Sequence, residues 1–219
     1  MRRVVEPEIL DDLPTDDPEA QSARADLRLL NFLMGNDRWI LRRVAEMPDR
    51  ARSGIVEWGA GSGDLLRRLA GFGPAIGVDR ATRPDGLPAE IGWRREDVFH
   101  DQTSGGVLVT NLFLHHFEAD ALRSLGERMS GFDAVVAVEP WRSRLALGLG
   151  GLMAPFVGRV TRHDMPVSIR AGFRRGELAG LLGLDADDWE ISEQLDGRGG
   201  LRWLARRRDV PGGMVEGRC

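Results

Sequence analysis

Two residue types are absent from this chain, and a third occurs once. Among the 219 residues there is no lysine and no tyrosine, so that all 30 basic side chains are arginines. The absence of lysine excludes Schiff-base chemistry and the lysine of phosphate-binding loops. The absence of tyrosine removes a phenol as acid or base, and with it the Tyr-Lys pair of short-chain dehydrogenases. The one cysteine, Cys219, cannot form an internal disulfide or a cysteine metal cluster.

Charge and length narrow the class of partner. A net charge of −4 provides no overall attraction to nucleic acid or to an anionic membrane. The apolar stretch at residues 145–160 is too short and too rich in glycine to span a bilayer, so we expect no stable membrane insertion. No segment resembles a secretory signal, and we therefore expect a cytoplasmic protein. The length suits one α/β domain, while the oligomeric state is left open.

Apolar runs typical of strands alternate with helical periodicity. The runs cover residues 54–58, 75–79, 91–98, 107–110 and 134–138, with helices expected at 64–70 and 118–129. Two further runs, 189–195 and 202–208, flank a glycine-rich turn and predict a hairpin. Residues 1–20 are punctuated by proline and predict an irregular arm, and 22–47 predict helix with a break at 35–36. We expect an α/β fold with a doubly wound, mostly parallel seven-stranded sheet and an N-terminal helical extension.

A glycine loop joins the first expected strand to the first expected helix. Its glycines, Gly59, Gly61 and Gly63, follow a G-x-G-x-G spacing, whereas the dinucleotide fingerprint is G-x-G-x-x-G. Glu57 and Asp64 flank the loop and would repel a pyrophosphate. Close charge pairs are worth about 1 to 4 kcal/mol at water-like to surface-like dielectric, which is enough to discriminate between ligands. The loop therefore favours a ligand with cationic groups.

Two more acids follow the next two strands. Asp79 ends the second strand, where a carboxylate can accept hydrogen bonds from both ribose hydroxyls. Asp97 ends the third, where a carboxylate can accept from an adenine amino group. Since the carboxyl ends of parallel strands meet at one edge of the sheet, we expect these acids and the glycine loop to face the same crevice.

These segments as a set resemble the motifs of class I methyltransferases, which use S-adenosylmethionine. Residues 57–63 resemble the first motif, 77–79 the second, 96–98 the third and 109–117 the fourth. The fourth motif has the His-His-Phe form seen among ubiquinone-like and secondary-metabolite methyltransferases. The resemblance covers roughly residues 54–140. It implies a Rossmann-like methyltransferase fold, S-adenosylmethionine as cofactor and S-adenosylhomocysteine as product.

The resemblance also assigns roles to single residues. It places the amino-acid end of the cofactor at Glu57 and the glycine loop, the ribose at Asp79, and the adenine at Asp97 and the amide of Val98. The full set of expected cofactor-binding residues is Glu57, Gly59, Ala60, Gly61, Gly63, Asp79, Arg80, Asp97, Val98, Asn111 and Leu112, the last two along the methionine portion.

Several classes of methyl acceptor are disfavoured. Amino-methylating DNA enzymes have a Pro-Pro-aromatic motif after the fourth strand, and residues 111–113 lack it. Cytosine-C5 enzymes need a catalytic cysteine, and Cys219 is wrongly placed. Protein-arginine enzymes use paired glutamates, whereas Glu139 stands alone before a proline. No clustered oxygen ligands suggest a metal site, so we expect none. A small-molecule acceptor remains.

A second, less specific resemblance concerns the rest of the chain. Residues 7–11, 30–35 and 168–173 resemble bacterial methyltransferases that act on phenolic or polyketide-type metabolites. In this fold the segment after the fifth strand often covers the acceptor pocket, so the apolar stretch 145–160 suggests a largely apolar acceptor, and we expect O-methylation. Residues 1–50 would then form an arm and cap helices, and residues 51–219 the methyltransferase domain, with 141–175 as an acceptor-covering insertion.

The acceptor pocket is predicted between the N-terminal helices and the apolar stretch 145–160. The expected acceptor-binding residues are Asn31, Met34, Met153 and His163. Methyl transfer depends mainly on alignment, and a base is needed only if the acceptor must lose a proton. His115 and His116, directly after the fourth strand, are the catalytic candidates because histidine titrates in the useful range.

Two other functions stay open at this point. An NAD(P)-dependent oxidoreductase would explain Asp79 but not the loop spacing or its flanking acids. A non-catalytic protein that binds S-adenosylmethionine would have the same cofactor residues. Either protein would be a soluble α/β domain, so only binding and activity measurements separate the three possibilities.

Overall fold

A single twisted sheet organises the chain. The computed structural model describes residues 1–14 and 16–208, and Cys219 lies outside the described residues. The strand order is β3-β2-β1-β4-β5-β7-β6. The strands are β1 (Ile55–Trp58), β2 (Ala75–Asp79), β3 (Gly92–Arg95), β4 (Val107–Asn111), β5 (Ala134–Pro140), β6 (Trp189–Leu195) and β7 (Gly200–Arg207). Strands β1 to β5 are parallel, and β7 pairs antiparallel with both β5 and β6. The predicted doubly wound, mostly parallel seven-stranded sheet is confirmed.

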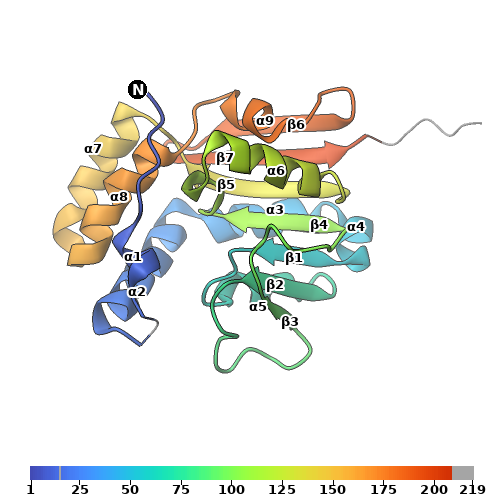
Figure 1. Ribbon diagram of the computed structural model, residues 1–219, viewed down its shortest axis with the longest axis horizontal. Helices are drawn as coiled ribbons and strands as arrows, with labels where there is room; N and C mark the ends of the chain where they lie inside the picture. Colours follow the sequence, from blue (N-terminus) through green and yellow to red (C-terminus); the bar gives the residue numbers. More distant parts are fainter. Residues whose placement is uncertain (15, 209–219) are drawn as a thin grey trace, which may run out of the picture.

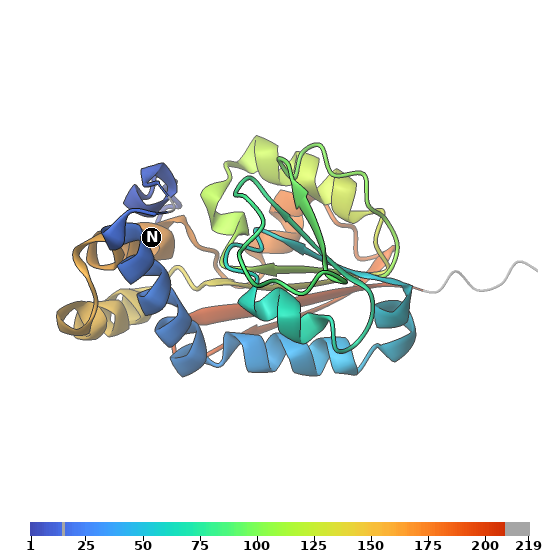
Figure 2. The ribbon, with the colours of Figure 1, turned by 90° about the horizontal axis from the view of Figure 1, so that it is seen from below.

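Helices cover both faces of the sheet, as Figure 2 shows. One face packs against α3 (Asn36–Ala45), α4 (Pro48–Ser53) and α5 (Asp64–Leu69), and the other against α6 (Ala119–Met129) and α9 (Glu177–Leu182). Every residue of β1 and β5 is buried, as expected for parallel strands covered on both sides. Strand β6 lies at an edge, and its burial alternates along the chain.

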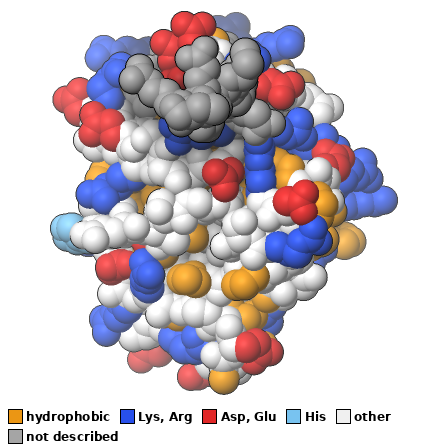
Figure 3. All heavy atoms as spheres, turned by 90° about the vertical axis from the view of Figure 1, so that its right-hand side faces the viewer, with side chains coloured by type: hydrophobic (Ala, Val, Ile, Leu, Met, Phe, Trp, Pro, Cys, Tyr) orange, Lys and Arg blue, Asp and Glu red, His pale blue; other side chains and the backbone are white. Residues whose placement is uncertain are grey.

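Further helices gather at one end of the sheet. These are α1 (Ile9–Asp12), α2 (Pro18–Met34), α7 (Arg144–Met153) and α8 (Arg159–Ala171), with short 3-10 turns η1 (Leu114–His116) and η2 (Ala154–Phe156). In Figure 1 they lie at the left, the end towards which β4 points. Figure 3 views the opposite end, where basic and acidic side chains are interspersed. Among the described residues, no helix is long and apolar enough to cross a membrane.

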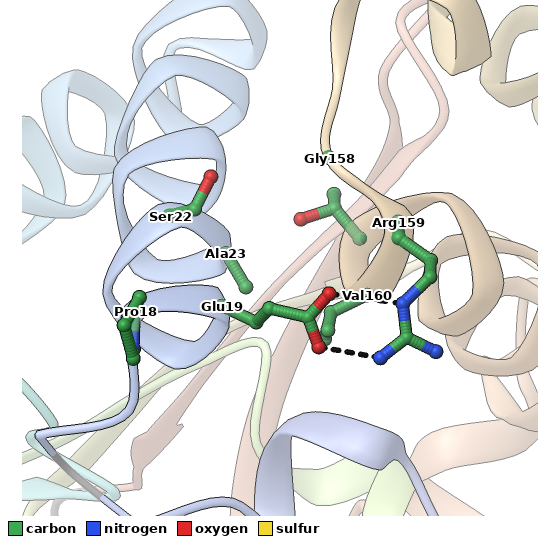
Figure 4. A pocket seen from close by; sticks show the side chains of 8 residues that line it. Pro18, Glu19, Ser22, Ala23, Gly158, Arg159 and Val160 are labelled. Atoms are coloured by element: carbon green, nitrogen blue, oxygen red, sulfur yellow. Dashed lines mark hydrogen bonds and ion pairs between the residues drawn. The ribbon is translucent and has the colours of Figure 1, made fainter.

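Helix α2 is fixed to α8 by polar contacts, which Figure 4 shows at a pocket of about 190 Å³. Arg159 Nε donates to Glu19 Oε1 over 2.9 Å. Two turns further along α2, Asp26 Oδ2 accepts from the amide of Gly158 and the hydroxyl of Thr161, both at 2.8 Å. These contacts set the separation between the N-terminal helices and the segment that follows β5.

The prediction of an irregular stretch over residues 1–20 is partly wrong. Helix α2 already begins at Pro18, because Asp17 caps the amides of Glu19 and Ala20 and a proline suits the first helical turn. Helix α1 depends on a tertiary contact, since Asp164 accepts from the amides of Ile9 and Leu10. The predicted break in the following helix is found at Gly35, which has a φ of 68°.

Candidate cofactor and acceptor sites

The loop after β1 needs its glycines. Gly59, Gly61 and Gly63 have φ values of 70°, 50° and 70°, a region that favours glycine. A Cβ at Gly59 would overlap the ring of Phe113, whereas one at Gly61 would meet only a backbone oxygen at 3.9 Å. The loop thus leaves its backbone at Gly61 open to a ligand, and that residue is exposed.

Glu57 is the buried acid of this region. Its side chain lies in β1, is 4% exposed as a residue, and its Oε2 has no hydrogen-bond partner among the described residues. Burial, with Asp37, Asp79 and Asp64 nearby, raises the pKa of Glu57 well above its usual value. A carboxyl oxygen buried without a partner costs stability. A cationic donor such as an ammonium would satisfy it.

Asp79, which ends β2, and Asp97, two residues after β3, lie at the same edge of the sheet. Asp79 Oδ2 accepts from the amide of Gly61 and Oδ1 from that of Ala81, both over 2.8 Å. Asp97 Oδ1 accepts from the amide of Phe99 over 3.0 Å, while Val98 is buried. Two more of the expected cofactor-binding residues lie in these loops: Ala60 is buried and Arg80 is exposed. Parallel pairing in register brings these loops side by side.

The end of β4 joins this edge to the N-terminal helices. Asn111 Nδ2 donates to Asn31 Oδ1 over 3.3 Å, and Asn36 Nδ2 donates to the same oxygen over 2.8 Å. Asn111 Oδ1 is buried without a partner among the described residues. Leu112 follows with a φ of 53°, an uncommon conformation for a branched residue. Asn31 therefore lies on the cofactor side of α2.

Leu112 also lines a largely apolar cavity of about 380 Å³. Helix α2 contributes five apolar side chains to it, α7 four and α8 two, and the loop between β6 and β7 closes one side. The principal apolar side chains on its wall are Leu27, Leu30, Leu33, Met34, Leu112, Leu149, Leu152, Met153, Met165 and Ile169. The structure thus brings the predicted residues Met34 and Met153 together.

The two histidines after β4 are held by carboxylates. His115 is buried, with Nδ1 2.8 Å from Glu139 Oε2 and Nε2 3.4 Å from Glu8 Oε1. Burial alone would lower the pKa of His115, but the hydrogen bonds to Glu139 and Glu8 outweigh it and raise the pKa to about 9. His116 is partly exposed, and its Nδ1 lies 3.4 Å from Asp11 Oδ2. Neither histidine lies on the described cavity wall.

His163, one of the expected acceptor-binding residues, lies outside the wall of this cavity. Its side chain is 53% exposed, and its Nδ1 lies 2.9 Å from Oδ1 of the neighbouring Asp164. Of these two residues, Asp164 is the one that lines the cavity. Sequence reasoning also missed Glu8, which lies on the wall, and the buried Glu139, which accepts from the amides of Phe113 and Leu114. A charged residue at the end of the all-apolar run of β5 was the available signal for Glu139.

One group of side chains has the composition of a metal site. Within residues 1–14 and 16–208, Glu8, His115 and His116 place ligand atoms within 4.8 Å of one another. However, both ring nitrogens of His115 face carboxylates, and a protonated imidazole has no lone pair to offer an ion. The geometry supports an ion-pair network at this place.

Comparison with protein-family models and with curated sequences gave no match. Among solved structures, the plantazolicin methyltransferase BamL in complex with a triazolic desmethylPZN analogue and SAH has a TM-score of 0.66 at 11% identity, covering 88% of this chain and 92% of that chain. Human N-acetylserotonin methyltransferase in complex with SAM has a TM-score of 0.55 at 14% identity, with coverage of 90% and 61%. Magnesium protoporphyrin IX methyltransferase from Synechocystis PCC 6803 with SAH has a TM-score of 0.53 at 14% identity, with coverage of 80% and 84%. The chain therefore has the class I methyltransferase fold.

Proposed function

We propose that this protein is an enzyme that transfers a methyl group from S-adenosylmethionine to a small, largely apolar metabolite. The observation that carries the proposal is the position of Leu112. It follows Asn111 at the end of β4, next to strand β1, which bears the buried, unpartnered carboxyl oxygen of Glu57, and it also forms part of the apolar cavity wall. A cofactor region and an acceptor pocket would meet there.

The residues at the carboxyl edge fit the cofactor. Glu57 would bind its ammonium, and the open backbone at Gly61 would approach its amino-acid end. Asp79 would accept from the ribose and Asp97, with the amide of Val98, would hold the adenine. Arg80 and Ala60 would flank these contacts, and Asn111 and Leu112 would lie along the methionine portion. Bound there, S-adenosylmethionine supplies an electrophilic methyl group on a sulfonium.

The acceptor would occupy the cavity between α2, α7 and α8. Its wall is mainly leucine and methionine, which suits an apolar body such as a phenolic or polyketide-type metabolite, and O-methylation is the proposed reaction. Holding the acceptor in line with the methyl group accounts for most of the catalysis in such a reaction. Residues 1–34 and the insertion 141–175 would cover the acceptor, whereas α3 and α4 pack against the sheet. A cytoplasmic location stays a prediction.

The predicted catalytic roles of the two histidines stay predictions. Since both ring nitrogens of His115 contact carboxylates, we favour an orienting role for it over that of a base. His116 is partly exposed and lies beside Asp11, and it stays the candidate for a base or an orienting residue.

Calorimetry with S-adenosylhomocysteine and NADH in parallel tests the proposal. We expect the first ligand to bind and NADH to give no heat, because Glu57 and Asp64 oppose a pyrophosphate. Tight NADH binding would instead support the oxidoreductase. If S-adenosylhomocysteine binds, incubation of the protein with S-adenosylmethionine and a panel of apolar phenols should release S-adenosylhomocysteine. Binding without turnover over a broad panel would favour the non-catalytic protein.

A further inference from the structure

The segment that covers the cavity carries a carboxylate into it. We use the name N-terminal arm for residues 1–13. The arm is tied to α8 at several points: the amide of Val4 donates to Arg170 O over 3.3 Å, and Arg3 Nε donates to Ala171 O over 2.7 Å. Further along, the amides of Ile9 and Leu10 donate to Asp164. Glu8 is therefore held in place between fixed neighbours.

One oxygen of Glu8 is fully engaged by the protein. Oε1 accepts from the hydroxyl of Ser168 and lies 3.4 Å from His115 Nε2. The side chain is 12% exposed. Burial alone would raise the pKa of Glu8, but the hydrogen bond from His115 lowers it overall. The group is thus an ionised carboxylate, in which each oxygen can accept hydrogen bonds.

The second oxygen of Glu8 stands apart from the other polar groups of the cavity. Asp164 is used by the arm and by His163, and the hydroxyl of Thr161 donates to Asp26. Ser168 donates to Glu8, and Arg198 contacts Asp196 and Leu33 O. By contrast, Glu8 Oε2 accepts no hydrogen bond from any described residue, although Glu8 lies on the cavity wall.

We infer that Glu8 binds the acceptor through a hydroxyl group, which donates to Oε2 at the polar end of the apolar cavity. The inference rests on the proposed function and makes it more specific, because it requires a hydrogen-bond donor on an otherwise apolar acceptor. His115 and Ser168 act as positioning residues, since they fix Oε1 and so direct Oε2. A carboxylate accepts and does not donate, so an acceptor with an ether or a carbonyl in that place would be rejected.

The test measures binding of three matched compounds to the protein saturated with S-adenosylhomocysteine. These are 1-naphthol, 1-methylnaphthalene, which has the same shape but no donor, and 1-naphthylamine, which donates through nitrogen. A hydrogen bond to a charged group is worth about 1.5 to 3 kcal/mol, so 1-naphthol should bind about 10-fold or more tighter than 1-methylnaphthalene. A wild-type protein without this preference, or with a preference for the amine over the naphthol, would overturn the assignment.

Variants then attribute the preference to Glu8. In Glu8→Gln the ratio of the two affinities should fall to about 3-fold or less, because the charge is lost. Glu8→Asp keeps the charge on a shorter chain and should restore part of the ratio. Asp12→Asn, an exposed acid of the same arm, is the control and should leave the ratio unchanged. An unchanged ratio in Glu8→Gln, or an equal loss for all three compounds, would contradict the inference.

Two further measurements distinguish a failure of this inference from a failure of the proposed function. S-adenosylhomocysteine binding and melting temperature are measured on every variant. If the wild-type protein does not bind S-adenosylhomocysteine, the proposed function fails, whereas a normal cofactor titration without naphthol selectivity refutes only the role of Glu8. Should Glu8→Gln not fold, the comparison of Glu8→Asp with Asp12→Asn decides. A ratio that is reduced in Glu8→Asp but not in Asp12→Asn supports the inference, and equal ratios in the two variants contradict it.

Discussion

His115 Nδ1 lies 2.8 Å from Glu139 Oε2, and both side chains are buried. The contact joins the end of β5 to η1, which begins two residues after Leu112. Glu139 also accepts from the amides of Phe113 and Leu114, so it supports the turn in addition to pairing with His115. The pair therefore fixes the stretch of chain where the cofactor residues and the acceptor cavity come together.

This ion pair should make stability depend on pH. The pKa of His115 is raised to about 9, above a value of about 6.5 expected in the unfolded chain. The stabilisation is therefore fully present below pH about 6.5 and decreases by about 1.4 kcal/mol per pH unit as pH rises towards about 9, where it is lost. The titratable groups beside the ring are Glu8, Glu139 and His116, and Arg3 donates to the backbone carbonyl of His115.

The measurement is the free energy of unfolding of wild type and His115→Gln between pH 6 and pH 10. The difference between the two proteins should be largest at the acid end and should disappear at the alkaline end. His100→Gln, an exposed histidine, should run parallel to wild type throughout. A His115→Gln curve that is parallel to wild type would show that the imidazole is not charged.

A second prediction concerns the unpartnered oxygen of Glu57. Glu57→Gln removes a buried carboxyl group without changing its size, so the ligand-free protein should melt at the same or a higher temperature. The affinity for S-adenosylhomocysteine should fall by about 10-fold or more, because a hydrogen bond to a charged group is lost. Calorimetry and thermal melting of the same sample measure both effects.

The control for that variant is Glu90→Gln, which changes an exposed carboxylate elsewhere. It should leave both the melting temperature and the affinity unchanged. If Glu57→Gln binds the ligand as tightly as wild type does, the ammonium is not held at Glu57.

The cofactor half of the molecule is largely visible in the sequence. Its strands are continuous apolar runs, and its glycines and acids stand at strand ends, so local patterns and parallel topology together place Gly61, Asp79 and Asp97 at one edge. The shorter extent of β3, which stops at Arg95, is the kind of boundary error that edge strands produce, since edge strands have fewer buried residues.

The acceptor half is harder to predict, because its contacts connect residues that are distant in the sequence. Met34 and Met153 can be predicted because the segments that contain them have more apolar side chains than one buried helix face needs, and both residues line the cavity. Glu8 could not be placed, since its partners His115 and Ser168 are 107 and 160 positions away along the chain. The direction in which His163 points depends on which face of α8 is buried, and that face is chosen by α2 and the arm.

A third prediction separates catalysis from structure at His116. If His116 acts as base or orienter, His116→Ala should lower turnover by roughly 100-fold or more, with little change in S-adenosylhomocysteine affinity. Turnover is measured as S-adenosylhomocysteine release with a phenol found active in the panel. His163→Ala, which removes an exposed imidazole outside the cavity wall, is the matched control. Equal losses of melting temperature and turnover in His116→Ala would identify a structural residue.

The last prediction tests the cavity by filling it. Met34→Trp and Met153→Trp each replace a flexible side chain with a larger indole ring, one on α2 and one on α7, in a cavity of about 380 Å³. Acceptor methylation should fall and the preference should shift towards smaller phenols, whereas S-adenosylhomocysteine should bind as before, because the cofactor residues lie beyond Leu112. Phe156→Trp, at a residue that is 74% exposed and outside the cavity wall, should behave as wild type. Since overpacking can cost about 1 to 3 kcal/mol, melting temperatures are recorded as well. Normal methylation by both filled variants would mean that the acceptor binds elsewhere.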